Sequence, residues 1–501
     1  MPPMRRACFV LVSLLSASAL FAQSPSATVT ILHFNDVYEI TPVEAGKAGG
    51  LARVATLRAR LKAQHPGLLT VLAGDYVSPS ALGTAKVNGE RLAGRQMVAV
   101  LNVLGLDWAT LGNHEFDIPE EAFRARVAES KFHLVSSNVT DAHGAPFPGI
   151  ATQAIVPVKA EGRTVRLGLL GLTIDANKQP WVRYSDPVAS ARAAVAQLKD
   201  KCDAIVALTH LALSGDQEVA EQVPEIDLIL GGHEHENWLI ERGPRFTPIV
   251  KADANVRTVA VVTMKFPGLP RRSGEAAKAG VRPVVSARLE RIDNRIREAP
   301  RVAAEVRKWT ELGFNGFRAD GFEPTAAVAT STEALDGRES AVRNHSTNLT
   351  DLIADAMRRE AGTDVAFFNG GSIRIDDVLP PGPITQYDVI HVLPFGGAVV
   401  RATFTGALLA KVLQIGQQNA GTGGFLQYAG VTREGGDFRI GGRPIDPAAR
   451  YTVAVTDFLL TGAEANLGFL TRQNPEIGGI TDLRDVRMAV IDELQRRFQR
   501  R

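Results

Sequence analysis

The chain is 501 residues long, with 45% hydrophobic residues, 22% charged residues and a formal net charge of +2. This length exceeds one compact core and favours two domains of ordinary size. The near balance of charge gives no basic footprint for nucleic acid or an anionic membrane, so we predict neither partner. An anionic ligand would have to be held by a local site.

The first 22 residues have the layout of a secretory signal peptide. Arg5 and Arg6 precede an apolar run over residues 7–15, and small residues lead to Ala22. The run is shorter than the roughly 20 residues that span a membrane, and the charged tail RRFQRR argues against a removable lipid-anchor signal. We therefore predict a secreted protein without a membrane anchor, most simply in a bacterial periplasm. Only Cys202 would remain in the mature chain, so no internal disulfide is expected.

From residue 28 to about 295, short runs rich in Val, Ile and Leu alternate with helical segments, which indicates a layered α/β domain. The runs are TVTILHF, LLTVLAG, WATLG, VRLGLLGLT, CDAIVALTH and IDLILGG. We predict a linker helix within residues 296–324. Residues 325–501 alternate again, with a helix at NLTDLIADAMRREAG and a strand at DVAFFNGG, and predict a second, smaller α/β domain.

Nearly all strand-like runs of the first domain end in Asp, Asn or His. In chain order these residues are Asp36, Asp75, Asn113, His114, His210, His233 and His235. Each alone is more often a cap or a packed side chain. Polar groups just past the carboxyl ends of buried strands converge on one rim of an α/β sheet, so the whole series predicts a shared site.

Carboxylates, an amide and imidazoles together suit two divalent metal ions held roughly 3.5 to 4 Å apart. We predict that Asp75 bridges the ions and that Asp36 and His235 complete one position. The other position would use Asn113, His210 and His233. The glycines of GNHE and GGHEH would leave space beside these ligands.

The motifs HFND, AGD, GNHEFD, LTH and GGHEH resemble, in order and spacing, those of the calcineurin-like metallophosphatases, and specifically the 5′-nucleotidase family. The resemblance covers essentially the whole mature chain. It implies a four-layered α/β/β/α sandwich joined by a helical linker to a smaller α/β substrate-binding domain. It also implies that His114 acts on the substrate phosphate in the transition state and that Asp117 orients it; the alternative for Asp117 is a plain helix cap.

The same resemblance implies a set of substrate-binding residues, mostly in the second domain. Two arginines would bind phosphate through bidentate hydrogen bonds, and two aromatic rings would enclose the base. These candidates are Arg343, Asn369, Arg374, Phe395, Gly423, Phe458 and Glu464. Because the predicted metal ligands and the substrate-binding residues lie on different domains, we hypothesise a hinge rotation of the domains that carries the substrate to the metals.

Two positions depart from the family pattern. Tyr38 stands where the family has a histidine ligand, which leaves open a weaker first metal position or its completion by water or Glu39. Beyond Phe458, the family commonly has Gly-Gly-Asp-Gly where this chain has Thr461 to Ala465. Glu464 is then the candidate for contacting the sugar hydroxyls.

These residues predict a metal-dependent phosphoric ester hydrolase, specifically a 5′-nucleotidase that releases phosphate from nucleoside monophosphates by attack of metal-activated water. The cofactor would be two ions of Zn, Mn, Co or Mg, and the oligomeric state stays open. Alternatives are a 2′,3′-cyclic-nucleotide phosphodiesterase, a UDP-sugar hydrolase, a thiosulfohydrolase, or a nucleotide-binding protein with an impaired centre.

Overall fold

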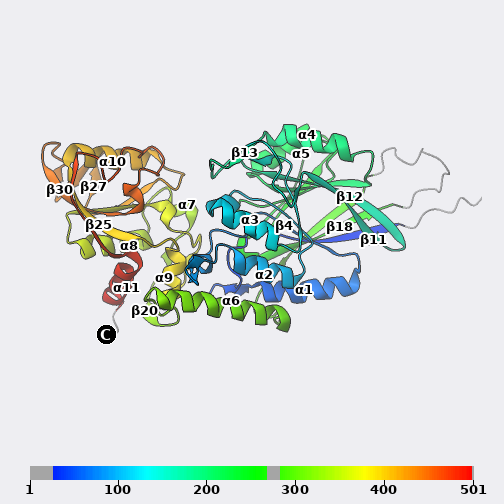
Figure 1. Ribbon diagram of the computed structural model, residues 1–501, viewed down its shortest axis with the longest axis horizontal. Helices are drawn as coiled ribbons and strands as arrows, with labels where there is room; N and C mark the ends of the chain where they lie inside the picture. Colours follow the sequence, from blue (N-terminus) through cyan, green and yellow to red (C-terminus); the bar gives the residue numbers. More distant parts are fainter. Residues whose placement is uncertain (1–25, 268–281, 499–501) are drawn as a thin grey trace, which may run out of the picture.

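The computed structural model describes residues 26–267 and 282–498, so the predicted signal peptide lies outside the described residues. The loop expected near residues 267–280 also lies almost wholly outside them. Figure 1 shows two domains side by side, the larger one formed by the N-terminal part of the chain. Among the described residues, no helix is long and apolar enough to cross a membrane.

The described part of the larger domain is built on two main β-sheets, of seven and six strands, with three two-stranded pairs beside them. In spatial order, the seven-stranded sheet consists of β10 (Ile150–Ala151), β8 (His133–Val135), β7 (Trp108–Thr110), β4 (Leu69–Ala73), β1 (Ala27–Phe34), β18 (Thr258–Phe266) and β19 (Val284–Arg291). The six-stranded sheet consists of β11 (Gln153–Ala160), β12 (Arg163–Thr173), β14 (Ala204–His210), β15 (Leu228–Gly231), β17 (Thr247–Lys251) and β16 (Trp238–Arg242).

Helices cover the outer faces of both sheets. Helices α1 (Leu51–Gln64) and α2 (Arg95–Leu104) share an apolar core with the seven-stranded sheet, and α3 (Glu120–Glu129) packs beside α2. Helices α4 (Pro187–Leu198) and α5 (Leu213–Gln222) cover the six-stranded sheet. A separate core, including Ile31, Val71, Leu169 and Val206, fills the space between the sheets. Central strands buried on both faces read as continuous apolar runs, and the predicted α/β/β/α sandwich is confirmed.

The predicted linker helix is α6 (Pro300–Ala319), which begins with a proline in its first turn. It packs along α1 and α2 rather than spanning free solvent (Figure 1). Near its C-terminal end, the rings of Phe314 and Phe317 pack against Tyr387 on α9 (Gln386–Val392). The helix therefore forms part of the larger domain's surface while touching the smaller domain.

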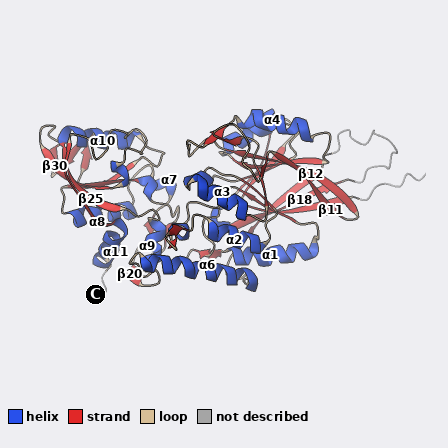
Figure 2. Ribbon diagram, viewed as in Figure 1, coloured by secondary structure: helices blue, strands red, loops and turns tan. Residues whose placement is uncertain are grey.

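The smaller domain is built on one five-stranded sheet of β26 (Leu426–Ala429), β22 (Val365–Asn369), β30 (Arg450–Thr456), β25 (Ala398–Thr405) and β31 (Ile477–Asp485). Helices α8 (Asn348–Ala361) and α11 (Val486–Arg497) pack on one face, and α10 (Gly406–Gln418) packs on the other (Figure 2). The short helix α7 (Glu339–Val342) precedes α8. The helix and strand predicted here are confirmed.

Candidate active site

The predicted metal ligands leave neighbouring parallel strands at one rim of the sandwich. Strands β1, β4 and β7 are adjacent, and Asp36, Asp75 and Asn113 follow them in that order. In the second sheet, β14 ends at His210 and its parallel neighbour β15 leads into the loop with His233 and His235. Both sheets thus deliver their loops to the same place.

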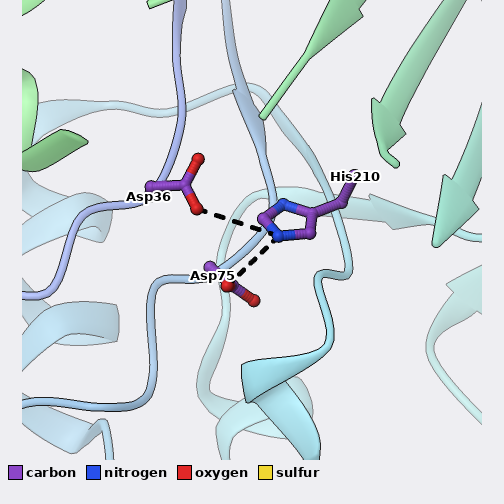
Figure 3. Close-up of side chains that lie close together, drawn as sticks. All are labelled: Asp36, Asp75 and His210. Atoms are coloured by element: carbon purple, nitrogen blue, oxygen red, sulfur yellow. Dashed lines mark ion pairs between the residues drawn. The ribbon is translucent and has the colours of Figure 1, made fainter. Parts of the chain in front are cut away.

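The innermost part of the site is a buried group of two carboxylates and one imidazole (Figure 3). One donor atom from each of Asp36, Asp75 and His210 lies within 4.8 Å of the other two. The His210 Nε2 atom is 3.1 Å from Asp75 Oδ2 and 3.8 Å from Asp36 Oδ1. The His235 Nε2 atom lies 3.3 Å from Asp36 Oδ1, so four of the six predicted ligands meet directly.

Asn113 and His233, the other two predicted ligands, lie at the same site. Asn113 Oδ1 is buried and has no hydrogen-bond partner among the residues that the structure describes. The His233 ring packs edge-on against His210 at a centroid distance of 5.3 Å, and its backbone N–H donates to Asp36 Oδ2 over 2.8 Å. Asn113, His233 and Asp75 line one cavity.

The donor atoms fit divalent cations. His210 Nδ1 bonds to the Ala73 carbonyl over 2.8 Å and His235 Nδ1 to Asp376 Oδ2 over 2.6 Å, which leaves both Nε2 atoms facing the carboxylates. This outer hydrogen bond is the usual way in which a protein orients a metal-binding imidazole. Among the described residues, the buried His210 Nε2 has no hydrogen-bond partner of good geometry, although Asp75 Oδ2 lies 3.1 Å away. Such unsatisfied buried polar atoms require an explanation, and an ion between these side chains supplies one.

The charges at the site also favour a cation. Although burial lowers it, the carboxylates of Asp75 and Asp36 raise the pKa of His210 to about 9. Burial raises the pKa of Asp36, but His210 and His235 hold it well below its usual range. Burial and the neighbouring His210 lower the pKa of His233 to about 4, so this imidazole is neutral and available as a ligand near neutral pH.

The backbone around these ligands is strained. Asp36, Asp75, His233 and His235 have φ angles of 51°, 56°, 86° and 55°, a region that residues other than glycine rarely adopt. Strain of this kind persists where the surrounding structure enforces it, typically at functional sites. The predicted role of the glycines is confirmed, because a Cβ atom on Gly112 would lie 2.1 Å from Asp75 Oδ1.

A buried carboxylate that the sequence analysis missed fixes two of the loops. Glu115 Oε1 accepts from the backbone N–H groups of Tyr76 and Val77, and Oε2 accepts from those of Asp75 and Gly112. Burial and the charge of Asp75 raise the pKa of Glu115 to about 7. Glu115 thereby holds the AGD and GNHE loops in register. The position of Glu115 within the GNHE motif was the feature of the sequence that could have indicated this role.

His114 forms a hydrogen-bonded chain with two other side chains. Its Nδ1 lies 2.6 Å from Asp117 Oδ2 within a short 3₁₀ turn, as the spacing of three predicts. Asn177, which the sequence analysis missed, donates from Nδ2 to Asp117 Oδ1 over 2.7 Å. Asn177 follows β12 at a φ of 51°, so an asparagine beyond a buried strand was the only sequence signal. With Nδ1 engaged, Nε2 is the atom of His114 available to a ligand in the cavity.

Tyr38 and Glu39 point to different places. The Tyr38 hydroxyl lies 3.1 Å from Asp36 Oδ1, 3.2 Å from Asp75 Oδ2 and 2.9 Å from His235 Nε2. Burial and the charges of both carboxylates raise the pKa of this phenol well above its usual value. Glu39 instead accepts a hydrogen bond from Tyr387 and lies 3.5 Å from His391 Nε2, and its role as a substitute metal ligand stays a prediction.

Two arginines of the smaller domain face the metal ligands across a cavity of about 840 Å³. Burial and the neighbouring Arg374 lower the pKa of Arg343 to about 10. Arg343 also pairs with Glu339. The buried Arg374 Nε has no hydrogen-bond partner within residues 26–267 and 282–498. Two neighbouring guanidinium groups with spare donors favour an anion between them and the metal ligands.

A second cavity, of about 820 Å³, adjoins the first because Arg374 and Gly423 line both. Phe395 and Phe458 line it, and each is 42% exposed, which is unusual for large apolar side chains. The remaining predicted substrate residues, Asn369 and Glu464, line it as well, together with Asp117 of the larger domain. All seven predicted substrate-binding residues therefore border one continuous cleft.

Polar contacts hold the two domains together around this cleft. Asp376 bonds to His235, Asp377 pairs with Arg257, and the Tyr387 hydroxyl donates to Glu39. In this arrangement the metal ligands and the arginines already line one cavity. The hinge rotation stays a prediction.

Comparisons with known proteins agree with this architecture. The model for calcineurin-like phosphoesterases matches residues 29–237, and that for the 5′-nucleotidase C-terminal domain matches residues 327–470. The chain is 26% identical to a 5′-nucleotidase of Vibrio cholerae over 517 residues, covering 91% of each chain. It is 27% identical to a snake venom 5′-nucleotidase of Naja atra over 456 residues, covering 81% of each. The structure of a 5′-nucleotidase precursor from Thermus thermophilus superposes with a TM-score of 0.74 at 26% identity, covering 94% of this chain and 97% of that one.

Fold and site together define a two-domain metallophosphoesterase, a hydrolase of phosphoric esters. The chain belongs to the 5′-nucleotidase family, with a calcineurin-like phosphoesterase domain followed by a 5′-nucleotidase C-terminal domain. The family, the fold and the class of reaction predicted from the sequence are confirmed.

Proposed function

We propose that the protein releases phosphate from nucleoside monophosphates. The observation that carries this proposal is the continuity of the cleft, which leads from the metal ligands past Arg343 and Arg374 to two exposed phenylalanine rings. A nucleotide presents a phosphate and an aromatic base joined by a sugar, and this order of groups matches the order of chemistries along the cleft.

The six ligand candidates would hold two divalent ions, with Asp75 between them. When bound, the ions lower the pKa of a coordinated water and polarise the phosphoryl group for in-line attack. Arg343 and Arg374 place the phosphate opposite the ligands. His114, held by Asp117, offers Nε2 to a phosphoryl oxygen or the leaving oxygen as charge develops there.

The two phenylalanines would enclose the base, since an aromatic face stacks on any purine or pyrimidine. Glu464 replaces the aspartate common in the family and lies beside the same cavity, where it is the candidate acceptor for sugar hydroxyls. Asn369 and Gly423 line the same cavity as these groups.

The test compares AMP with glycerol phosphate in the Phe458→Ala variant. Loss of one stacking partner costs about 1 to 3 kcal/mol, so the KM for AMP should rise about 5- to 150-fold while glycerol phosphate turnover is unchanged. Phe246→Ala is the matched control, because Phe246 is 71% exposed and does not line the cleft. An unchanged KM for AMP would contradict the proposal that the base stacks on Phe458.

The alternative phosphoric ester substrates are distinguished by comparing the rates of hydrolysis of AMP, 2′,3′-cyclic AMP, ATP and a UDP-sugar. The base-stacking pair argues against a thiosulfohydrolase, whose substrate has no ring to stack. The intact His114 and Asp117 pair argues against a protein that only binds nucleotide.

We propose further that the protein is exported, on the strength of the basic, apolar and small-residue pattern of its first 22 residues. N-terminal sequencing of protein from the periplasmic fraction of an expressing bacterium should begin near Gln23. Full-length protein in the cytoplasm would contradict export.

A further inference from the structure

Tyr38 has surroundings that the metallophosphoesterase reading does not yet explain. Its hydroxyl contacts donor atoms of three ligand candidates: Asp36, Asp75 and His235. The side chain is only 8% exposed, so water does not account for this arrangement. The hydroxyl can accept from the His235 Nε2–H, but its single proton can satisfy only one of the two carboxylates at a time.

The distances among these atoms are those of a coordination sphere. The hydroxyl lies 2.9 to 3.2 Å from the three donors, and His235 Nε2 lies 3.3 Å from Asp36 Oδ1. Metal–ligand bonds of about 2.1 Å place adjacent donors of a four- to six-coordinate ion about 3.0 to 3.4 Å apart. Four of the six distances among these donor atoms therefore match the spacing of donors around one ion.

We infer that the Tyr38 phenol oxygen is itself a ligand at the first metal position, in place of the imidazole usual in the family. The inference rests on the proposed metal-dependent function only in taking this cluster as the metal site. The position then has three oxygen donors, from Asp36, Asp75 and Tyr38, and one nitrogen donor, from His235.

The substitution makes the two positions chemically unequal. The second position has two imidazoles, His210 and His233, besides oxygen from Asp75 and Asn113. Oxygen donors suit Mg²⁺ and Mn²⁺, whereas imidazole suits Zn²⁺. The first position should therefore prefer Mn²⁺, relative to a Tyr38→His variant that restores the nitrogen donor.

The test is calorimetric titration of metal-stripped wild type, Tyr38→Phe and Tyr38→His with Mn²⁺ and with Zn²⁺, beside the near-ultraviolet absorbance of tyrosine. Wild type should bind two ions per chain, with a tyrosine difference spectrum as the first position fills. Tyr38→Phe should bind one of them at least about 100-fold more weakly, since loss of even an outer partner of a ligand costs up to about 100-fold. Tyr38→His should bind two ions, give no such spectrum and shift its preference toward Zn²⁺.

Tyr184→Phe is the matched control, because Tyr184 is a nearby tyrosine whose hydroxyl donates to the Ala176 carbonyl and, within the described part of the chain, to no metal-ligand candidate. It should keep both ions and the spectrum. Two ions bound to Tyr38→Phe as tightly as to wild type would overturn the inference. So would a single ion in wild type and two in Tyr38→His, which would mean that the phenol excludes the metal. Each result stands apart from phosphate release, so failure of the proposed function would be seen separately.

Discussion

Replacing Glu115 by glutamine should unfold the metal-binding loops with almost no change in side-chain shape. Its two carboxylate oxygens accept four backbone N–H groups, two on each oxygen. Glutamine keeps one oxygen and turns an NH₂ group toward the other two donors. Each hydrogen bond to a charged group contributes about 1.5 to 3 kcal/mol, so losing two should lower the free energy of unfolding by about 3 to 6 kcal/mol. That is a large part of the stability of an ordinary domain.

Urea unfolding followed by tryptophan fluorescence measures this loss in the relevant domain. All four tryptophans lie in the larger domain or on α6, so the signal reports unfolding there. The titration belongs at pH 8, above the pKa of about 7 of Glu115, where the carboxylate is ionised. Glu120→Gln is the matched control, since the exposed ion pair with Arg124 contributes less than about 1 kcal/mol. A Glu115→Gln protein within about 1 kcal/mol of wild type would refute the role assigned to this carboxylate.

Three further predictions concern catalysis, the core and pH. The Asp117→Asn variant should have a kcat at least about 10-fold lower with little change in bound metal, because His114 loses the carboxylate that orients it. A metal content that falls by the same factor as kcat would contradict this prediction. The Lys251→Met variant should have a free energy of unfolding about 3 to 5 kcal/mol lower in urea titrations, because the buried ammonium pairs with Asp216. A decrease below about 1 kcal/mol would contradict this prediction. Burial raises the pKa of Glu493, but hydrogen bonds from two arginines on α11 outweigh burial and lower it to about 2. The contribution of ionised Glu493 to the free energy of unfolding is thus complete above the unfolded pKa of 4.5 and is lost as the pH falls toward 2. In thermal melts, the melting temperature of a Glu493→Gln variant should fall less than that of wild type over this pH range.

Much of this fold could be predicted because its signals are local. Buried strands such as β4 and β14 read as apolar runs, and each ends at a polar residue that its loop exposes to the rim. The order of motifs along the chain then predicted the family, and with it the two domains. The cleft residues followed from the same resemblance, and the structure places them along one surface.

The contacts that the sequence did not predict join residues far apart in the chain. Asn177 meets Asp117 across 60 residues, and Asp376 meets His235 across 141 residues and a domain boundary. The local sequence around an asparagine or aspartate in a loop does not indicate which distant residue it contacts. The hydrogen bond between Glu39 and Tyr387 likewise depends on α9 packing beside the larger domain.

The central claim is metal-dependent release of phosphate at this site, and one measurement tests it most directly. Metal-stripped protein is assayed for phosphate release from AMP with and without Mn²⁺, Zn²⁺, Co²⁺ or Mg²⁺, beside His114→Ala. We predict no release without metal, restored release with at least one of these ions, and a loss of about 100- to 10,000-fold in the variant despite retained metal. Release that persists without metal, or that is undiminished in His114→Ala, would contradict the account.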